Sequence, residues 1–234
     1  MKKILIIVPT YNEKNNIKIL IKKIRRSVKN YKLLFIDDNS PDGTRKIIET
    51  YLNKNIHLIN RNKRSGIGSA HKFGIKIGYK KKFEFIITMD CDGTHNPVNI
   101  KKMIKKMKNN DLVVTNRFLN KNSISDWTLF RKLLTHFRHF IIKFFLNIPY
   151  DSSGAFRCYK TKNIKLKDIL LAKDNGYNFF WESMFVLDKK KYKISEIPIY
   201  LPRRITGSSK MRIKDIVYAA YYLFIVYINE KFKK

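Results

Sequence analysis

The chain has 234 residues, 44% of them hydrophobic and 13% aromatic, which excludes an intrinsically disordered protein and is enough for one sizeable α/β domain. Its 50 Lys and Arg against 18 Asp and Glu give a formal charge of +32, which favours an anionic partner: a phospholipid surface, a phosphorylated substrate or nucleic acid. An AT-rich genome is an alternative explanation for the size of this charge, since Lys, Asn and Ile are all abundant, but it does not explain where particular arginines fall.

In the first half of the chain, apolar runs of strand length alternate with helical patterns. The runs are Ile4–Val8, Leu33–Ile36, Ile56–Ile59, Phe85–Met89 and Leu112–Thr115. Between the first two, residues 16–28 carry apolar side chains at helical spacing. Repeated strand–helix units predict an α/β fold of the Rossmann-like kind, with a mainly parallel sheet covered by helices on both faces. In such sheets ligands bind beyond the carboxyl ends of the strands.

After about residue 118 the pattern changes. It predicts a long helix over Trp127–Leu146, a turn at Asp151–Gly154, a helix near Phe179–Leu187, a strand at Lys193–Tyr200 and an aromatic helix from Met211. The longest apolar stretch, Ile216–Ile228, is too short to span a bilayer and is rich in Tyr, so we expect amphipathic, interfacial helices. We predict one domain over residues 1–234, with residues 1–118 as one half and 119–234 as the other.

Two cysteines, Cys91 and Cys158, provide neither a disulfide framework nor zinc spacing. They suit a reducing compartment. The apolar stretch that ends at Pro9 lacks a small-residue cleavage site after it, so we interpret it as a buried first strand and not as a signal peptide.

Polar residues follow four of the predicted strands, at Pro9–Glu13, Asp37–Thr44, Asp90–Asp92 and Asn116–Arg117. In an extended stretch, Asp90 and Asp92 project to the same side. Two such carboxylates can share a hard cation, Mg²⁺ or Mn²⁺, whose coordination a pyrophosphate completes. An Asp-x-Asp pair alone is more often a solvated turn, but the buried strand before this pair strengthens the metal-site hypothesis.

Two other motifs have simpler structural interpretations. Oxygen-bearing residues between Asp38 and Glu49 fit an EF-hand spacing, but an apolar run enters that loop in place of a helix and Pro41 stiffens its middle. A turn and a helix start explain it better. The segment Ser65–Ala70 lacks the last glycine of a dinucleotide fingerprint, so close backbone packing or a helix start near a phosphate is the better interpretation.

A basic loop, Arg203–Lys210, contains Gly and Ser and could fold over an anion, although a solvated linker is the plainer interpretation. The five histidines do not cluster at metal spacing. His136 and His139 lie in a helix patterned for packing or a membrane surface, and we assign them no chemistry. No Ser-His-Asp or Cys-His arrangement can be argued from their order.

In order and spacing, five motifs resemble those of the dolichol-phosphate mannosyltransferases, which are inverting glycosyltransferases of the GT-A fold. These motifs are Pro9–Glu13, Asp37–Thr44, Asp90–Pro97, Asp151–Arg157 and Arg204–Lys210. Together they cover nearly the whole chain. The resemblance implies metal-assisted transfer of a sugar, mannose from GDP-mannose, to a polyprenyl or dolichyl phosphate.

The resemblance also implies roles for individual residues. The nucleoside would be held by Pro9, Tyr11, Glu13, Ile36 and Asp38. The diphosphate and the metal would lie along Asp90, Cys91 and Asp92. The sugar diphosphate or the lipid phosphate would face Arg117, Arg131, Arg204 and Lys210. The family's metal-binding Gln is replaced by Thr94, whose hydroxyl could substitute for it.

The expected chemistry needs no strong base, because a lipid phosphate is already an anion that can attack the anomeric carbon. Asp151 is the best candidate for a base, although holding a turn suits it better. We expect the enzyme to be peripheral, at the cytoplasmic face of a membrane, with the two aromatic helices on the bilayer. A separate membrane-anchor subunit is a further expectation.

Other functions compete with this one. A UDP-glucose-dependent polyprenyl-phosphate glucosyltransferase would have the same fold, since nothing in Tyr11, Glu13 or Asp38 decides the base. A same-fold transferase could act on a protein or polysaccharide, but the basic loop and the aromatic helices favour a phosphorylated lipid. A nucleic-acid-binding module would leave the strand-end motifs without a purpose, so we expect no specific nucleic acid partner.

Overall fold

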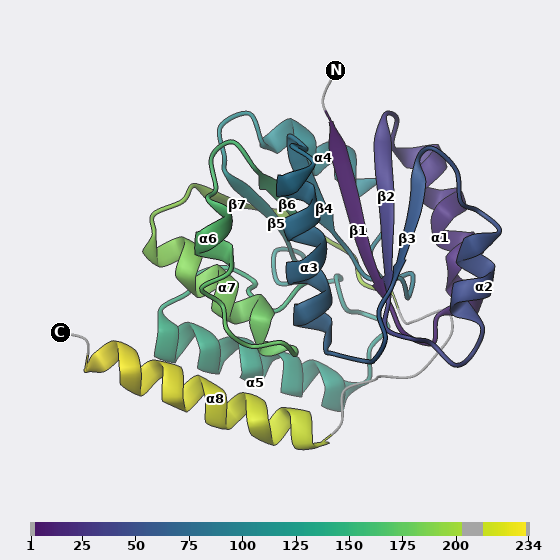
Figure 1. Ribbon diagram of the computed structural model, residues 1–234. Coiled ribbons are helices and arrows are strands. Elements are labelled where there is room, and N and C mark those ends of the chain that lie inside the picture. The colour runs from purple at the N-terminus through teal and green to yellow at the C-terminus, as the bar shows by residue number, and fades with distance from the viewer. Residues whose placement is uncertain (1–2, 203–212, 233–234) are drawn as a thin grey trace.

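The computed structural model describes residues 3–202 and 213–232, and its centre is a twisted sheet. The strands are β1 (Ile4–Thr10), β2 (Tyr31–Asp37), β3 (Ile56–Asn60), β4 (Phe85–Thr88), β5 (Leu112–Asn116), β6 (Arg157–Lys160) and β7 (Ile194–Pro198). Their spatial order is β3-β2-β1-β4-β6-β5-β7 (Figure 1). β6 runs antiparallel to both of its neighbours, and all other pairs are parallel. The predicted α/β fold with a mainly parallel sheet is therefore confirmed.

Helices cover both faces of this sheet. They are α1 (Lys14–Ser27), α2 (Thr44–Glu49), α3 (Ile67–Lys80), α4 (Asn99–Lys106), α5 (Leu129–Leu146), α6 (Leu166–Ile169), α7 (Asn178–Lys189) and α8 (Ile213–Lys231). One face of β1 packs with apolar residues of α1, α2 and α4, whereas the other packs with α3, α6 and α7. Alternate residues of β1 enter the two cores: Ile6 and Val8 lie in the first, and Leu5 and Ile7 in the second.

Each predicted strand and long helix forms within a few residues of its expected position. Two short elements in the second half, β6 and α6, were not predicted. β6 is inserted between β4 and β5 with the opposite direction, so that its first residue, Arg157, pairs with Thr88. The loop that precedes β6 therefore lies at the same sheet edge as the ends of the parallel strands.

Two aromatic helices, α5 and α8, lie side by side at the base of the molecule (Figure 1). A small third core joins them to α7 through Ile142, Leu146, Trp181 and Leu223. Tyr222 of α8 also donates its hydroxyl hydrogen to the Glu182 carboxylate at 2.9 Å. None of the helices within residues 3–202 and 213–232 combines the length and the apolar character that crossing a bilayer requires.

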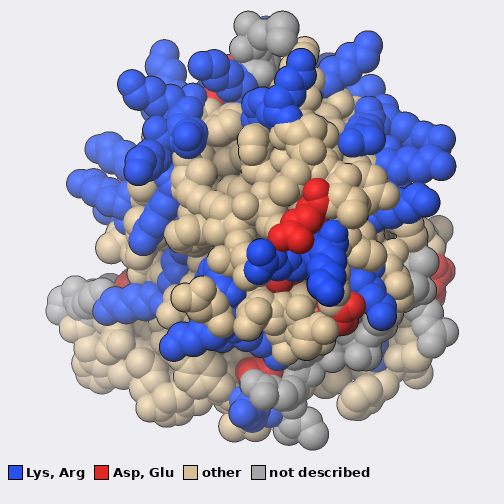
Figure 2. All heavy atoms as spheres, turned by 45° about the vertical axis from the view of Figure 1, so that its right-hand side comes forward, with Lys and Arg blue, Asp and Glu red and all other residues tan. Residues whose placement is uncertain are grey.

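Both aromatic helices leave large apolar side chains uncovered. On α5 these include Leu129, Phe130 and Phe144, each more than 70% exposed. On α8 they are Ile216, Val217, Tyr218, Tyr221 and Phe224. By contrast, the face turned toward α1 and α2 carries many Lys and Arg side chains and few Asp or Glu (Figure 2). The molecule thus combines a basic surface with an apolar base.

Candidate active site

The loops after β1 and β2 are joined by hydrogen bonds at the carboxyl edge of the sheet. The strands are in register, so Thr10 pairs with Asp37 at their ends. The Thr10 hydroxyl donates to Asp37 Oδ1 at 2.8 Å, and the backbone N–H of Asn12 donates to Ser40 Oγ at 3.0 Å. Because buried carboxylates at strand ends need donors, Asp37 fixes the shape of this double loop and is not itself open to a ligand.

Further along the same double loop, Glu13 and Asp42 hold the starts of two helices together. The Glu13 backbone N–H donates to Thr44 Oγ1 at 2.8 Å, and the Lys14 N–H donates to Asp42 Oδ2 at 3.2 Å. Asp42 Oδ1 accepts from the backbone and the hydroxyl of Thr44, where α2 begins. The Asp42–Thr44 motif is therefore a turn and a helix start, as expected.

Asp38 is held by a residue that the sequence did not single out, Arg61. Arg61 Nε donates to Asp38 Oδ1 at 2.5 Å, and Arg61 Nη1 donates to Ser69 Oγ at 2.8 Å. The Ser65 backbone N–H donates to the second Asp38 oxygen at 3.2 Å. Asp38 is buried, so this ion pair orients its carboxylate rigidly.

Two other nucleoside-site candidates lie in different environments. The Tyr11 ring is half-buried and lies beneath the Arg64 guanidinium, whose carbon is 4.5 Å from the ring centroid. The Ile36 side chain is fully buried in the core, against the position of Gly74. A ligand could therefore reach Ile36 only through its backbone. Pro9 lies half-buried at the end of β1.

The segment Ser65–Ala70 packs closely, as the sequence suggested. Gly66 has a φ of +94°, and a Cβ there would lie 2.3 Å from the Asn175 carbonyl oxygen. At Gly68 a Cβ would lie 2.6 Å from the Gly176 carbonyl oxygen. Glycine is thus required where this loop meets the 175–176 turn.

The Asp90–Thr94 segment follows β4 and carries the two carboxylates predicted to bind metal. Asp92 is buried, and its Oδ1 accepts from the Thr94 hydroxyl at 2.6 Å and from the Thr94 N–H at 3.1 Å. The Asp90 side chain is 33% exposed, and the Asp90 N–H donates to His95 Nδ1 at 2.9 Å. Cys91 is buried in the core.

Two carboxylates of this kind suit a metal that a substrate helps to hold. Within the described residues, no group of three or more His, Cys, Asp or Glu is arranged around a metal position. Mg²⁺ commonly binds one or two carboxylates and completes its shell with water and substrate phosphate oxygens. Asp90 and Asp92 fit this mode, whereas a closed, all-protein metal site is not present in the described part of the chain.

Arg117 and Asp151 form a nearly buried ion pair beside β5. Arg117 Nε and its backbone N–H both donate to Asp151 Oδ2, at 2.7 and 3.2 Å. Burial by itself would raise the pKa of the Asp151 carboxyl, but the charge and hydrogen bonds of Arg117 outweigh it and hold that pKa below its ordinary value. Asp151 also accepts from Ser153, so it holds the turn and remains ionised, which makes it a poor general base.

Arg157, fully buried, secures the same turn from the other side. It donates to the carbonyl oxygens of Ser152, Gly154 and Phe180 and to the Ser183 hydroxyl, at 2.7 to 2.9 Å. Backbone and hydroxyl partners on four sides make Arg157 a structural residue, although it lies within a motif singled out from the sequence.

The remaining predicted residues lie on or after the second half of the fold. Arg131, in the first turns of α5, stacks on Trp127 with its guanidinium carbon 3.5 Å from the ring centroid. Trp127 Nε1 donates to the Leu201 carbonyl oxygen, which fixes the chain just before residue 203. Arg204 and Lys210, with the rest of the Arg203–Lys210 loop, lie outside the described residues.

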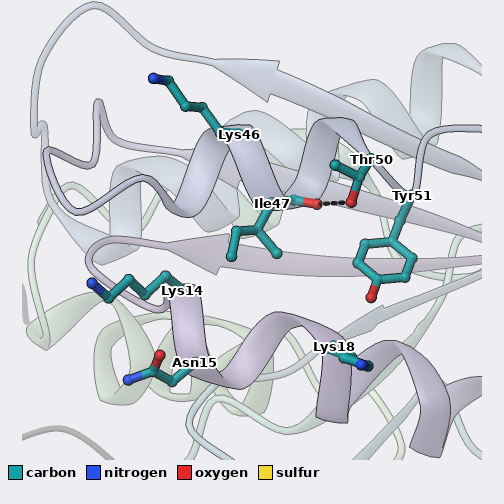
Figure 3. Close-up of a pocket in the computed structure, with 7 residues that line it drawn as sticks. All are labelled: Lys14, Asn15, Lys18, Lys46, Ile47, Thr50 and Tyr51. Carbon is teal, nitrogen blue, oxygen red and sulfur yellow. Dashed lines mark hydrogen bonds between the residues drawn. The ribbon is translucent and has the colours of Figure 1, made fainter.

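A separate hollow of about 510 Å³ lies between α1 and α2 (Figure 3). It is lined by Lys14, Asn15, Lys18, Lys46, Ile47, Thr50 and Tyr51. None of the described residues predicted for the site lines it. The candidate active site is instead the row of loops along the carboxyl edge of the sheet.

Comparisons with known proteins identify the family and the fold of this chain. A family model described as Glycosyl transferase family 2 matches residues 5–167. The undecaprenyl-phosphate mannosyltransferase of Micrococcus luteus is 26% identical over 212 residues, which cover 89% of this chain and 87% of that protein. The polyprenol monophosphomannose synthase of Mycolicibacterium smegmatis is 24% identical over 217 residues, which cover 91% of this chain and 82% of that one.

Solved structures show the same fold at lower identity. Mannosyl-3-phosphoglycerate synthase from Rubrobacter xylanophilus superposes with a TM-score of 0.66 at 12% identity, covering 99% of this chain and 74% of that one. Glucosyl-3-phosphoglycerate synthase from Mycobacterium tuberculosis, solved with Mn²⁺, UDP-glucose and phosphoglyceric acid, gives a TM-score of 0.63 at 14% identity. It covers 97% of this chain and 79% of that one.

Proposed function

The chain belongs to glycosyl transferase family 2, and from this premise we propose that it transfers mannose from GDP-mannose to the phosphate of a polyprenyl lipid. One observation carries the proposal: the strand-end motifs lie along one edge of the sheet, and α5 and α8 nearby expose large apolar side chains. The names of the two relatives each mention a polyprenyl acceptor and mannose, and this supports the choice of acceptor and sugar.

The nucleoside would bind in the double loop after β1 and β2. Asp38, oriented by Arg61, would accept hydrogen bonds from it, and the Tyr11 ring offers a stacking surface. Pro9, Glu13 and the backbone of Ile36 would complete this pocket. We also propose that Lys210 binds the nucleotide-sugar donor.

The diphosphate would lie along the loop after β4, over Asp90, the Cys91 backbone and Asp92. A divalent cation, Mg²⁺ or Mn²⁺, would be held by Asp90 and Asp92 and would offset the charge that develops on the departing nucleotide diphosphate. Because its hydroxyl donates to Asp92, Thr94 would orient that carboxylate. A place for Thr94 in the metal shell itself remains a prediction from the sequence.

In the reaction, an acceptor phosphate oxygen would form a bond to the anomeric carbon as the bond from that carbon to the diphosphate breaks. The configuration at that carbon would be inverted. Arg117, fixed by Asp151, would offset repulsion between the two anions, with Arg131 and Arg204 as additional cations. No general base is needed, which agrees with the low pKa of Asp151.

The lipid would reach this site from a membrane under α5 and α8. Their uncovered aromatic and aliphatic side chains would enter the interface, and nearby Lys and Arg would contact anionic headgroups at about 1 kcal/mol each. We infer peripheral binding at the cytoplasmic face, with a separate anchor subunit as a further proposal. Residues 1–118 would serve the donor and residues 119–234 the acceptor and membrane, within one domain.

A transfer assay tests the proposal. Purified protein would receive radiolabelled GDP-mannose or UDP-glucose, a short polyprenyl phosphate and Mn²⁺, with an EDTA control. We expect label in the organic phase from GDP-mannose and a loss of label with EDTA. If only UDP-glucose gives labelled lipid, the donor is UDP-glucose and not GDP-mannose. If neither donor gives labelled lipid, the proposal is rejected.

A further inference from the structure

A group of basic side chains on α5, which the proposed mechanism does not use, lies beside the Arg117–Asp151 pair. We call His136, Arg138, His139 and Lys143 the α5 cluster. On this helix Thr135, Ile142 and Leu146 face the protein core, and His139 lies half-buried on the same side. The helical spacing therefore turns His139 inward, toward the end of β5.

Ring contacts fix the position of His139. Its imidazole stacks on Phe118, with centroids 4.1 Å apart and planes inclined by 23°. The His136 ring lies 5.2 Å from the same phenyl ring. Since Phe118 directly follows Arg117, this contact holds α5 against the segment that carries the arginine of the candidate active site.

The charges that face one another here are mostly positive. His139 is close enough to Asp151, Lys143, Arg117 and His136 for each to influence its ionisation. Arg138 lies three residues after Thr135 and four before Ile142, on the same side of α5. Its side chain is exposed, and the charges of Arg117 and Asp151 act on its pKa in opposite directions. The carboxylate that acts on both His139 and Arg138 is that of Asp151. Glu196 lies next to Asp151 and accepts its backbone N–H at 2.8 Å.

Arg117 retains donors for a ligand. Arg117 uses Nε and its backbone N–H on Asp151, whereas neither Nη group donates to a residue in the described part of the chain. The Nη2 side faces Gly154, where even an added Cβ would lie 3.5 Å away. Guanidinium Nη groups in this arrangement are suited to phosphate oxygens.

We propose that His139 and Arg138 bind the phosphate monoester of the acceptor together with Arg117, and that His139 does so in its protonated form. This inference rests on the proposed function and adds two acceptor-binding residues to it. Phe137 and Phe140, the neighbours of these residues along α5, are both more than 60% exposed. A phosphate in the cluster would thus lie at the border of the apolar base, where the headgroup of a lipid phosphate would be.

The proposal predicts the direction in which the pKa of His139 changes when the acceptor phosphate binds. In the free protein, burial first and then the neighbouring cations lower the pKa of His139 below 6.5, while Asp151 opposes them. A bound phosphate, with a charge of about −1.5 to −2 at pH 7, would favour the imidazolium form and raise that pKa. Acceptor binding should therefore take up a proton and weaken as the pH rises through the pKa of the complex.

Histidine NMR tests the binding step without any sugar transfer. The imidazole signals would be titrated between pH 5 and 8 with no ligand, with farnesyl phosphate and with farnesol, at fixed ionic strength. We expect farnesyl phosphate to raise the pKa of His139 by about half a unit or more, and farnesol to leave it unchanged. His57, exposed on β3, serves as the internal control. An unchanged His139 pKa, or an equal rise at His57, would overturn the proposal.

Steady-state kinetics distinguish phosphate binding by His139 from its packing against Phe118. The variant His139→Phe keeps an aromatic ring for stacking but removes the imidazole, and Arg138→Gln removes the guanidinium. At pH 6.5 we expect each to raise the acceptor KM about three- to tenfold and to leave the donor KM within twofold. The difference between wild type and His139→Phe should shrink toward pH 8.

The matched control for charge is Arg26→Gln, on the exposed face of α1. A normal acceptor KM in both α5 variants, or equal increases in the acceptor and donor KM, would contradict the assignment. If the chain transfers no sugar at all, the NMR titration still decides whether the cluster binds a phosphate monoester. Failure of this inference is therefore distinguishable from failure of the proposed function.

Discussion

Arg117 and Asp151, which are 34 residues apart in the chain, meet at 2.7 Å and join the end of β5 to the turn before β6. Asp151 is 1% exposed and the Arg117 side chain 10% exposed, so solvent screens this pair only weakly. The pair fixes one cation at the sheet edge and leaves its Nη groups for an anion. The pair thus belongs to the sheet edge and to the candidate active site, and it lies beside the α5 cluster.

Asp151→Asn should destabilise the protein and change its response to pH. Removing one partner of a buried pair leaves the other charge without compensation, which costs about 3–5 kcal/mol. The pKa of Asp151 is lowered in the folded protein, so its contribution is complete above the unfolded value near 3.9 and is lost as the pH falls through the folded value.

Urea unfolding of wild type and Asp151→Asn at pH 7, 5 and 3 measures this effect. The difference in the free energy of unfolding should be largest at pH 7 and should shrink toward pH 3. A difference that does not change with pH would mean that the carboxylate charge is not what stabilises the turn.

Asp92→Asn should reduce turnover by at least about a hundredfold and leave the fold intact. The substitution removes one of the two carboxylates proposed to hold the metal, and it also weakens the acceptor for the Thr94 hydroxyl. Transfer rate and thermal unfolding would be measured together. Turnover near the wild-type rate would remove Asp92 from the metal site, whereas the control Asp126→Asn, at a surface position, should retain activity.

Arg61→Gln should weaken nucleotide binding about tenfold, although Arg61 is not itself proposed to contact the nucleotide. Its guanidinium orients the Asp38 carboxylate, and a charged hydrogen bond of this kind contributes about 1.5–3 kcal/mol. Titration calorimetry with GDP measures the effect. The matched control is Arg45→Gln, which breaks the exposed pair with Glu49 and a contact of the Arg45 guanidinium with Asn60. Equal GDP affinity in both variants would show that nucleotide binding by Asp38 does not depend on its ion pair with Arg61.

Gly68→Ala should lower the free energy of unfolding by about 1–3 kcal/mol, because the new methyl group would overlap the Gly176 carbonyl oxygen and Phe179. Gly154→Ala is the control, since a Cβ there makes only ordinary contacts of 3.5 Å or more. Chemical denaturation of both variants checks the prediction. A normal stability of Gly68→Ala would show that the α3 start can move away from the 175–176 turn.

Replacing both Phe137 and Phe140 by Ser should weaken binding to anionic vesicles by at least about tenfold. Burying one such ring contributes about 1.5–3 kcal/mol, and both rings are exposed on the apolar base. Cosedimentation with vesicles measures the effect, and Phe73→Ser on α3 is the control. If the double variant binds vesicles as wild type does, α5 is not the membrane contact.

Much of the fold was predictable because its signals are local. The apolar runs of β1, β2, β4 and β5 and the helical spacing in α1 and α5 each fit within one element. The strand-end rule then predicted that Pro9–Glu13, Asp37–Thr44 and Asp90–Asp92 share one sheet edge, and they do.

The missed features depend on partners distant in the chain. β6 has four residues with a charge at each end, and Arg157 is buried because backbone carbonyls from two other segments surround it. Arg61 is placed by its ion pair with Asp38, 23 residues earlier, and His139 is placed by its stacking on Phe118. In each case the side chain alone gives no signal, since only the folded contacts distinguish it from a solvated basic residue.

The most direct test of the central claim is the identity of the lipid product. Protein, GDP-mannose, a short polyprenyl phosphate and Mn²⁺ would be incubated, and the extracted lipid examined by mass spectrometry and by NMR of the anomeric centre. We predict one hexose on the lipid phosphate, in the β configuration, because a single inverting displacement acts on an α-linked donor. Free mannose, an α-linked product or an unmodified lipid would contradict the proposed reaction.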